Sequence, residues 1–203
     1  MKLLYAPTSP YVRKVLVAAH EVGLADAIEV VPVQASPTGR DAETTVHNPL
    51  GKIPTLVTED GVLFDSRVIC EYLDARAPGP RLFPAEGPAR WSALARQALA
   101  DSLLDAALLT RYERTLRPVH LRWDAWDAGQ IAKITAALDR IEASAAGFGG
   151  SIDIGAIATG CALAYLDFRF PDIDWRKERP AATAWYATFA GRPSMAATTP
   201  RQS

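Results

Sequence analysis

The chain has 203 residues, of which 49% are hydrophobic and 22% are charged. This composition is typical of a folded globular protein and excludes a disordered or fibrous chain. Lys and Arg number 22 against 23 Asp and Glu. The resulting net charge of -1 gives no electrostatic basis for binding nucleic acid or an anionic membrane, so we expect neither as a partner.

Cysteine and histidine are both scarce, with two and three residues respectively. These counts argue against a disulfide framework and against a structural zinc site, so we expect no metal. No apolar run approaches the roughly 20 residues that span a bilayer. The apolar stretch at the start breaks at Pro7, unlike that of a signal peptide, and we therefore expect a cytoplasmic protein.

The first eighty residues alternate between strand and helix patterns. Leu3–Tyr5 is a short apolar run that ends before Pro7, which predicts a buried strand. Apolar residues at helical spacing from Val12 to Val22 predict a helix, and Gly23 ends it. The β-branched run at 28–33 predicts a second strand. A right-handed crossover makes these two strands parallel.

A polar loop follows and leads to a second pair of strands. Residues 53–57 predict the third strand, the Asp60-Gly61 dipeptide predicts a hairpin turn, and residues 62–64 predict the antiparallel fourth strand. The apolar positions from Val68 to Leu73 then predict an amphipathic helix. This order of elements is that of a thioredoxin-like α/β domain.

The segment from Pro78 to Pro88 is rich in proline and glycine, which predicts a linker. Everything after it is rich in Ala and Leu at helical spacing, with almost no strand pattern. The expected helices are 88–116, 123–146, 153–169 and 180–190, with a short turn at 193–198. The predicted organisation is a thioredoxin-like domain at 1–79, a linker at 80–87 and an all-helical domain at 88–203.

The segment Thr8-Ser9-Pro10-Tyr11 lies between the first strand and the first helix. Ser9 is a typical N-cap, and Pro10 suits the first turn of a helix. The same hydroxyl could instead be presented to a ligand at the helix N-terminus. The helix dipole and free N–H groups favour negative charge there, and both interpretations remain open.

Two further segments each have a structural and a functional interpretation. Asn48-Pro-Leu-Gly-Lys-Ile-Pro-Thr-Leu enters the third strand through Pro54, where a cis peptide bond would leave the backbone of Ile53 free to pair with an extended peptide. Asp65-Ser66 opens the second helix, and its simplest role is an N-cap. Alternatively, Ser66 and the helix N–H groups would hold a carboxylate while Asp65 pairs with an ammonium.

Three motifs occur together in one order: Ser-Pro-Tyr-Val-Arg-Lys-Val from Ser9, Asn-Pro-Leu-Gly-Lys-Ile-Pro from Asn48, and Phe-Asp-Ser-Arg-Val-Ile from Phe64. In order and spacing they resemble the glutathione S-transferase family. With the linker and the helical half, the resemblance covers nearly the whole chain and is greatest to bacterial, serine-type members. It implies a thioredoxin-like N-terminal domain followed by an all-α domain, in a homodimer.

The resemblance also implies glutathione as co-substrate and assigns residues to each part of this tripeptide. Asp65 and Ser66 would hold its γ-glutamyl end. The backbone of Ile53, before Pro54, would pair with its cysteinyl residue, and Lys52 would meet its glycyl carboxylate. The implied reaction is transfer of glutathione to a small hydrophobic electrophile. A non-catalytic binding or regulatory module with the same fold is the alternative function.

The resemblance assigns to Ser9 a hydrogen bond to the glutathione sulfur. A free thiol has a pKa near 8.5, and lowering it by about two units costs ~2.7 kcal/mol. One hydrogen bond to a charged partner, together with the helix dipole, supplies that amount. Thr8 and Tyr5 are alternative donors, although the apolar neighbours of Tyr5 favour core packing. A redox mechanism would need a cysteine at position 9, whereas Cys70 and Cys161 lie on apolar helical faces.

The pocket for the electrophile is expected where the helical half faces Ser9, lined by the first long helix, with the C-terminal segment as a further candidate. Its candidate residues are Leu108, Arg111, Tyr112 and Arg114, with Trp123 and Trp126 beyond them. Arg13, one turn into the first helix, is expected to be solvated.

The helix predicted from residue 153 begins differently from its relatives. Asp153-Ile-Gly-Ala156 stands where they carry Ser/Thr-x-x-Asp, a reciprocal capping box. Asp153 can still cap this helix, but Ala156 offers no side-chain acceptor. Gly155 is expected to weaken the first turn further, so we expect a less stable helix start.

Overall fold

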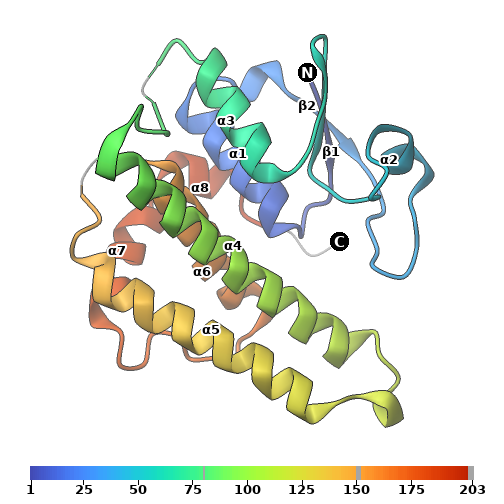
Figure 1. Ribbon diagram of the computed structural model, residues 1–203, viewed down its shortest axis with the longest axis vertical. Coiled ribbons are helices and arrows are strands. Elements are labelled where there is room, and N and C mark those ends of the chain that lie inside the picture. Colours follow the sequence, from blue (N-terminus) through green and yellow to red (C-terminus); the bar gives the residue numbers. More distant parts are fainter. Residues whose placement is uncertain (80, 150–151, 201–203) are drawn as a thin grey trace. The chain divides into compact units, whose positions relative to one another are not determined.

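The computed structural model describes residues 1–79, 81–149 and 152–200 (Figure 1). The chain forms two compact units. The first unit contains residues 1–90 and the segment that begins at Pro193, and the second unit contains residues 91–192. No helix among the described residues is long and apolar enough to cross a membrane.

A four-stranded sheet forms the centre of the first unit. Its strands follow the order β2-β1-β3-β4, and they are β1 (Lys2–Tyr5), β2 (Glu29–Pro32), β3 (Thr55–Thr58) and β4 (Gly61–Leu63). β1 and β2 are parallel and lie next to each other in Figure 1, whereas β3 is antiparallel to both β1 and β4. The predicted parallel pair and hairpin are confirmed, and each strand lies within two residues of its predicted bounds.

Two helices, α1 (Pro10–Glu21) and α3 (Ser66–Arg76), pack against each other beside this sheet. They supply most of the core of the first unit through apolar side chains with no exposed surface: Val12, Val15, Val17, Ile69 and Leu73, which join Leu3 and Leu56 from the sheet. Burying each of the larger side chains contributes about 1.5–3 kcal/mol to folding. The helical periodicity seen in the sequence therefore marks the buried faces of these helices.

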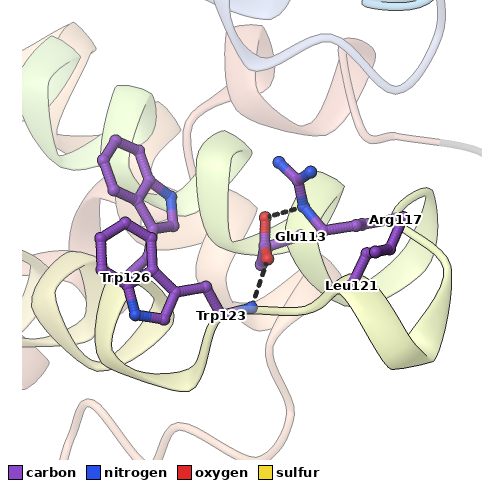
Figure 2. Close-up of a pocket in the computed structure, with 5 residues that line it drawn as sticks. All are labelled: Glu113, Arg117, Leu121, Trp123 and Trp126. Carbon is purple, nitrogen blue, oxygen red and sulfur yellow. Dashed lines mark hydrogen bonds and ion pairs between the residues drawn. The ribbon is translucent and has the colours of Figure 1, made fainter.

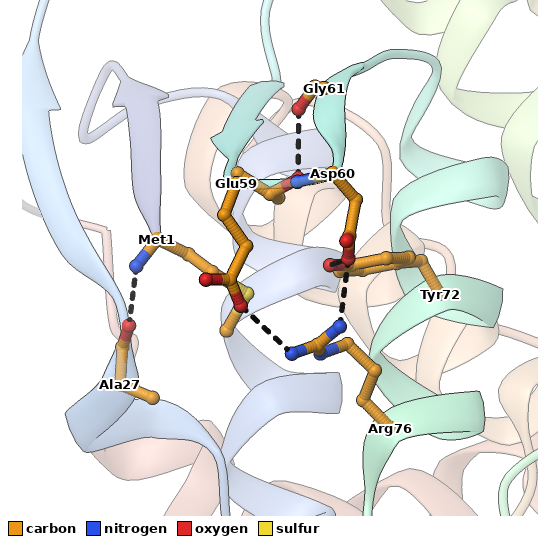
Figure 3. Close-up of polar contacts among 8 residues, drawn as sticks. Met1, Ala27, Glu59, Asp60, Gly61, Tyr72 and Arg76 are labelled. Atoms are coloured by element: carbon orange, nitrogen blue, oxygen red, sulfur yellow. Dashed lines mark hydrogen bonds and ion pairs between the residues drawn. The ribbon is translucent and has the colours of Figure 1, made fainter.

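The Asp60-Gly61 turn is tied to α3 at one corner of the sheet (Figure 3). Gly61 has a φ of 128°, a conformation that glycine adopts without strain. Asp60 Oδ2 accepts hydrogen bonds from the Tyr72 hydroxyl at 2.9 Å and from Arg76 Nη1 at 2.8 Å. The predicted hairpin turn is confirmed, and its second function is to join the β3–β4 hairpin to the helix.

A short helix, α2 (Ala42–His47), replaces part of the polar loop that the sequence predicts. Asp41 caps it, because its Oδ1 accepts the backbone N–H of Thr44 at 2.8 Å and the Thr44 hydroxyl at 2.9 Å. These hydrogen bonds lower the pKa of Asp41 below its usual value. The loop prediction was wrong here because aspartate and threonine are as typical of loops as of helix starts. A 3-10 turn, η1 (Ala25–Ala27), precedes β2.

The last helix, α8 (Pro193–Ala197), packs on α1 within the first unit. Arg13 Nη2 donates to the Met195 carbonyl at 3.1 Å, and Ser194 donates its hydroxyl proton to the Glu21 carboxylate. The expectation that Arg13 is solvated was wrong, since only 8% of this residue is exposed. Its guanidinium is hydrogen-bonded to the backbone of α8 instead of to water.

The second unit is built from helices: most of α4 (Gly87–Thr115), then η2 (Val119–Leu121), α5 (Asp124–Ala145), α6 (Ile154–Arg169) and α7 (Pro180–Ala190). The predicted all-helical half is confirmed, with helix bounds shifted by one residue at most for the four long helices. α6 is the core of the unit, because every residue from Ile154 to Leu166 is buried.

The start of α6 lies directly against α4. Asp153 caps α6 by accepting the Ala156 N–H at 2.9 Å, and the same carboxylate pairs with Arg96. A Cβ on Gly155 would lie 2.7 Å from the Ala93 carbonyl oxygen. Gly155, expected only to weaken the first turn, is therefore the residue that allows the two helices to approach.

We predict that Gly155→Ala lowers the free energy of unfolding by about 1–3 kcal/mol, because the new methyl group would overlap backbone that cannot move aside cheaply. Gly129 is the matched control, since it lies on the exposed side of α5 and a Cβ there would meet nothing within 4 Å. Alanine at that position should raise the free energy of unfolding by ~0.5–1 kcal/mol. Urea denaturation measures both variants, and equal effects would contradict the close-packing role.

Candidate functional site

The three predicted ligand-binding segments emerge at one end of the sheet. Ser9 follows the end of β1, and Ile53 precedes the start of β3. Because β3 is antiparallel to β1, its first residue, Thr55, lies opposite Leu4 near the end of β1. β4 reverses direction again, so its last residue also lies beside the start of β3 and leads into Asp65. The strand order thus brings together segments that are far apart in the sequence.

Ser9 is a half-buried N-cap of α1. Its Oγ accepts the backbone N–H of Val12 at 3.3 Å. A hydroxyl group has one proton to donate and two lone pairs that accept. Capping therefore uses one lone pair and leaves the proton available, and no acceptor among the described residues takes it. The two interpretations of Ser9 are compatible, since the cap and a ligand would use different parts of the same hydroxyl.

A cavity of about 160 Å³ lies beside Ser9 in the first unit. It is lined by Tyr5, Ala6, Pro7, Ser9, Val12, Arg13, Leu16 and residues 197–199. Tyr5 was expected in the core but is only half-buried, so it is still an alternative donor. Thr8 is not one of the described residues that line this cavity.

The loop before β3 is held by Asn48, which is 1% exposed. Its Nδ2 donates to the Lys52 carbonyl at 2.9 Å and to the Thr55 hydroxyl at 3.2 Å, while its Oδ1 accepts the Leu50 N–H at 3.0 Å. The Ile53–Pro54 peptide bond is cis, as the sequence allowed. Ile53 lies before the first paired residue of β3, and the Lys52 side chain is exposed.

Asn48 is a positioning residue whose role the sequence analysis did not identify. Its place at the head of the second motif was the only indication in the sequence. A buried asparagine with three hydrogen bonds to loop atoms fixes the path of residues 50–55.

Asp65 and Ser66 open α3 as the sequence predicts. Asp65 Oδ1 accepts the Arg67 N–H at 2.8 Å, which makes Asp65 the N-cap, and Ser66 donates its hydroxyl proton to the same oxygen at 3.3 Å. Ser66 is 3% exposed, whereas Asp65 is exposed. A carboxylate has about four lone-pair sites. Capping therefore leaves Asp65 with acceptor capacity toward solvent.

Together these segments present a defined set of charges and hydrogen-bonding groups. Two helix N-termini favour negative charge, and the Lys52 ammonium adds a further positive charge. Asp65 supplies one negative charge, and Ser9 supplies a hydroxyl proton. This set matches an extended, zwitterionic, peptide-like ligand.

Among the residues that the structure describes, no three His, Cys, Asp or Glu side chains are placed to hold a metal ion. Cys70 and Cys161 have no exposed surface, which confirms the prediction that both are buried.

Two of the candidates for the electrophile pocket line a separate cavity of about 310 Å³ in the second unit (Figure 2). Trp123 and Trp126 are stacked there with ring centroids 6.4 Å apart. The buried Glu113 carboxylate accepts Arg117 Nε at 2.6 Å and the Trp123 backbone N–H at 2.8 Å. The hydrogen bond from Arg117 is the main reason that the pKa of Glu113 is lowered.

The other candidates on α4 have different surroundings. Arg114 holds the helices of the second unit together, because its Nε donates to Asp127 at 2.9 Å and its Nη1 donates to Asp172 at 3.1 Å. This pairing with two acids indicates a structural role. Leu108, Arg111 and Tyr112 are half-buried.

Comparisons with known proteins agree with this geometry. The glutathione S-transferase N-terminal domain matches residues 8–76, and the glutathione S-transferase C-terminal domain matches residues 89–188. The uncharacterized GST-like protein YibF of Escherichia coli K12 is 32% identical over 205 residues, which cover 98% of each chain.

Two crystal structures of glutathione transferase family members from Pseudomonas fluorescens Pf-5 are each 46% identical in sequence to this chain. One, with bound glutathione, has a TM-score of 0.97 and covers 99% of both chains. The other, with bound S-(propanoic acid)-glutathione, has a TM-score of 0.92 and covers 100% of both chains. The chain therefore belongs to the glutathione S-transferase family.

Proposed function

We propose that the protein is a glutathione S-transferase that stabilises the thiolate of glutathione and conjugates it to a small hydrophobic electrophile. The observation that carries this proposal is the undonated hydroxyl proton of Ser9 at the N-terminus of α1. The similar proteins with bound glutathione and S-(propanoic acid)-glutathione support it.

The charges of glutathione match the residues at this end of the sheet. Its γ-glutamyl ammonium would pair with Asp65, and the adjoining carboxylate would meet Ser66 and the N-terminus of α3. Its cysteinyl backbone would pair with Ile53, which lies outside the β3 ladder. The exposed Lys52 would meet the glycyl carboxylate. Each charged group of the ligand then has a partner of opposite charge or polarity.

Ser9 would act by stabilising the thiolate, with no general base required. The thiol loses its proton to solvent, and the Ser9 hydroxyl donates to the sulfur anion that remains. The sulfur lone pair then forms a bond to the electrophilic carbon, and a leaving group departs with its electron pair. One hydrogen bond worth about 1.5–3 kcal/mol, together with the dipole of α1, supplies the ~2.7 kcal/mol that makes thiolate the major form at neutral pH.

Two features support a homodimer that works in the cytoplasm. Val62, Phe64 and Val68 expose apolar side chains on β4, the residue after it and α3, at 38%, 37% and 47% respectively, and a second copy would cover them. The two buried cysteines, Cys70 and Cys161, form no disulfide, which is usual where thiols are kept reduced.

We predict that Ser9→Gly raises the pKa of the bound glutathione thiol toward about 8.5 and lowers kcat/KM at pH 7 by about 10–100-fold. Glycine is chosen because it costs a helix cap only a few tenths of a kcal/mol, so the fold is kept while the hydroxyl is lost. The absorbance of the thiolate, followed against pH, measures the pKa directly.

Thr8→Val and Tyr5→Phe are the controls for this experiment, because each removes one alternative hydroxyl donor. Both should leave the thiol pKa unchanged. If the thiol pKa in Ser9→Gly equals that in the wild-type protein and is raised in one of the two controls, the sulfur contact belongs to the residue changed in that control. Glutathione binding without conjugation of any electrophile tested would favour the non-catalytic binding module instead.

A second prediction concerns Asp65→Asn, which should weaken glutathione binding by about 10-fold or more because one charged partner is lost. Asparagine is as good an N-cap as aspartate, so α3 should remain intact. Asp41→Asn makes the same change at the N-cap of α2 and should leave binding unchanged. Calorimetry measures both, and equal affinities of the two variants would remove Asp65 from the site.

A further inference from the structure

Arg13 is a buried cation of the first unit that the mechanism described above does not use. Only 8% of this residue is exposed. Its Nη2 donates to the Met195 carbonyl at 3.1 Å and its Nε donates to the Thr198 hydroxyl at 3.4 Å, and both acceptors are neutral. No carboxylate among the described residues contacts it. Because arginine is rarely buried without an anionic partner, the position of this charge calls for an explanation.

The acids on the elements around Arg13 are distant from it or paired elsewhere. β1 and α8 contain no acid. Glu21, the acid of α1, lies eight residues further along the helix, which is about 12 Å at a rise of 1.5 Å per residue. On α3, which packs against α1, Glu71 and Asp74 each pair with another arginine. The other basic side chains of α1 are Lys14 and His20.

The cavity beside Ser9 is the place where an anion could meet this charge. Ser9 and Arg13 both line this cavity of about 160 Å³. They are one helical turn apart, because the Arg13 backbone N–H donates to the Ser9 carbonyl at 3.0 Å, and a side chain on a helix leans toward the N-terminus. Two of the five N–H groups of the guanidinium donate to α8 and the residue after it, which fixes its position at the cavity wall.

The volume of this cavity and the groups that line it indicate which part of a ligand would enter. Sites that enclose a whole drug-sized ligand measure roughly 300–1,000 Å³, so this cavity would hold only one end of glutathione. The two carboxylates of glutathione have proposed partners in Lys52 and the N-terminus of α3, and neither lines the cavity. The anionic group that remains for the cavity is the thiolate.

We propose that Arg13 stabilises the bound thiolate of glutathione through its positive charge, and that the thiolate is the counter-ion of Arg13. This inference rests on the proposed function, because it needs glutathione beside Ser9. A helix N-terminus carries roughly half a positive charge, whereas Arg13 carries a whole one, and opposite charges attract more strongly where water is excluded. The sulfur would then be stabilised by a hydroxyl, a helix dipole and a buried guanidinium.

The test compares two substitutions of Arg13 by the absorbance of the thiolate against pH. Arg13→Gln removes the charge but keeps a donor for α8, and it should raise the pKa of the bound thiol by about one unit. The ratio of thiolate to thiol at a given pH then falls about tenfold. Arg13→Lys keeps the charge and should keep the pKa close to that of the wild-type protein.

Two control variants separate the charge from the attachment of α8. Arg76→Gln removes the same charge beside the Asp60-Gly61 turn, at the other end of the sheet. Ser194→Ala removes the hydrogen bond from α8 to Glu21 without changing any charge. Both controls should leave the thiol pKa unchanged.

S-methylglutathione is the control ligand, because it has no thiol to ionise. In calorimetry at pH 8, Arg13→Gln should bind glutathione about 5–10-fold more weakly than the wild-type protein and S-methylglutathione equally well. At about pH 5.5, where the thiol is protonated in both proteins, the two affinities for glutathione should also be equal. A loss that is the same for both ligands would assign Arg13 to holding α8 and overturn the proposal.

A measurement on the wild-type protein keeps the test valid if a variant fails to fold. The NMR resonance of the Arg13 Nε–H should titrate with the thiol in the glutathione complex and stay constant in the S-methylglutathione complex. A constant resonance in both complexes, or an unchanged thiol pKa in Arg13→Gln, would overturn this inference. If the pKa is unchanged there but raised in Ser9→Gly, the proposed function stands without Arg13, whereas a wild-type protein that binds no glutathione contradicts both.

Discussion

The pairing of β3 with β1 on one side and β4 on the other is the constraint on which the candidate binding site depends. Leu3 lies opposite Leu56 in this ladder, and neither residue has exposed surface. A shift of β3 by one residue would turn Leu56 away from the core, so burial of apolar surface sets the register. The positions of Ser9, Ile53 and Asp65 follow from that register, although none of them contributes to it.

The sequence predicted those parts of the fold that depend on local patterns. β-branched runs, a turn dipeptide and N-cap residues located the strands, the hairpin and the helix starts to within a few residues. Features that depend on distant contacts could not be predicted. Arg13 is buried because it meets Met195, which is 182 residues further along the chain. Glycine is required at position 155 because Ala93 and Arg96 lie against it.

The two units differ in how completely the protein satisfies the hydrogen-bonding groups of their polar residues. At the end of the sheet, Ser9 and Asp65 each cap a helix and keep unused hydrogen-bonding capacity. The fold therefore gains stability from the same atoms that a ligand would contact. In the second unit, by contrast, Arg169 Nε is buried without a hydrogen-bond partner among the described residues, so this nitrogen adds no stability to the fold.

The position of α8 has a consequence for the order of events during synthesis. The first unit is discontinuous in the chain, because its sheet precedes the second unit whereas α8 follows it. Arg13 cannot reach Met195 until α8 has left the ribosome. The N-terminal sheet and its helices therefore wait, incompletely packed on one face of α1, while all of the second unit is made. A ribosome-stalled chain lacking α8 would carry that face uncovered, open to chaperones that bind unfinished domains.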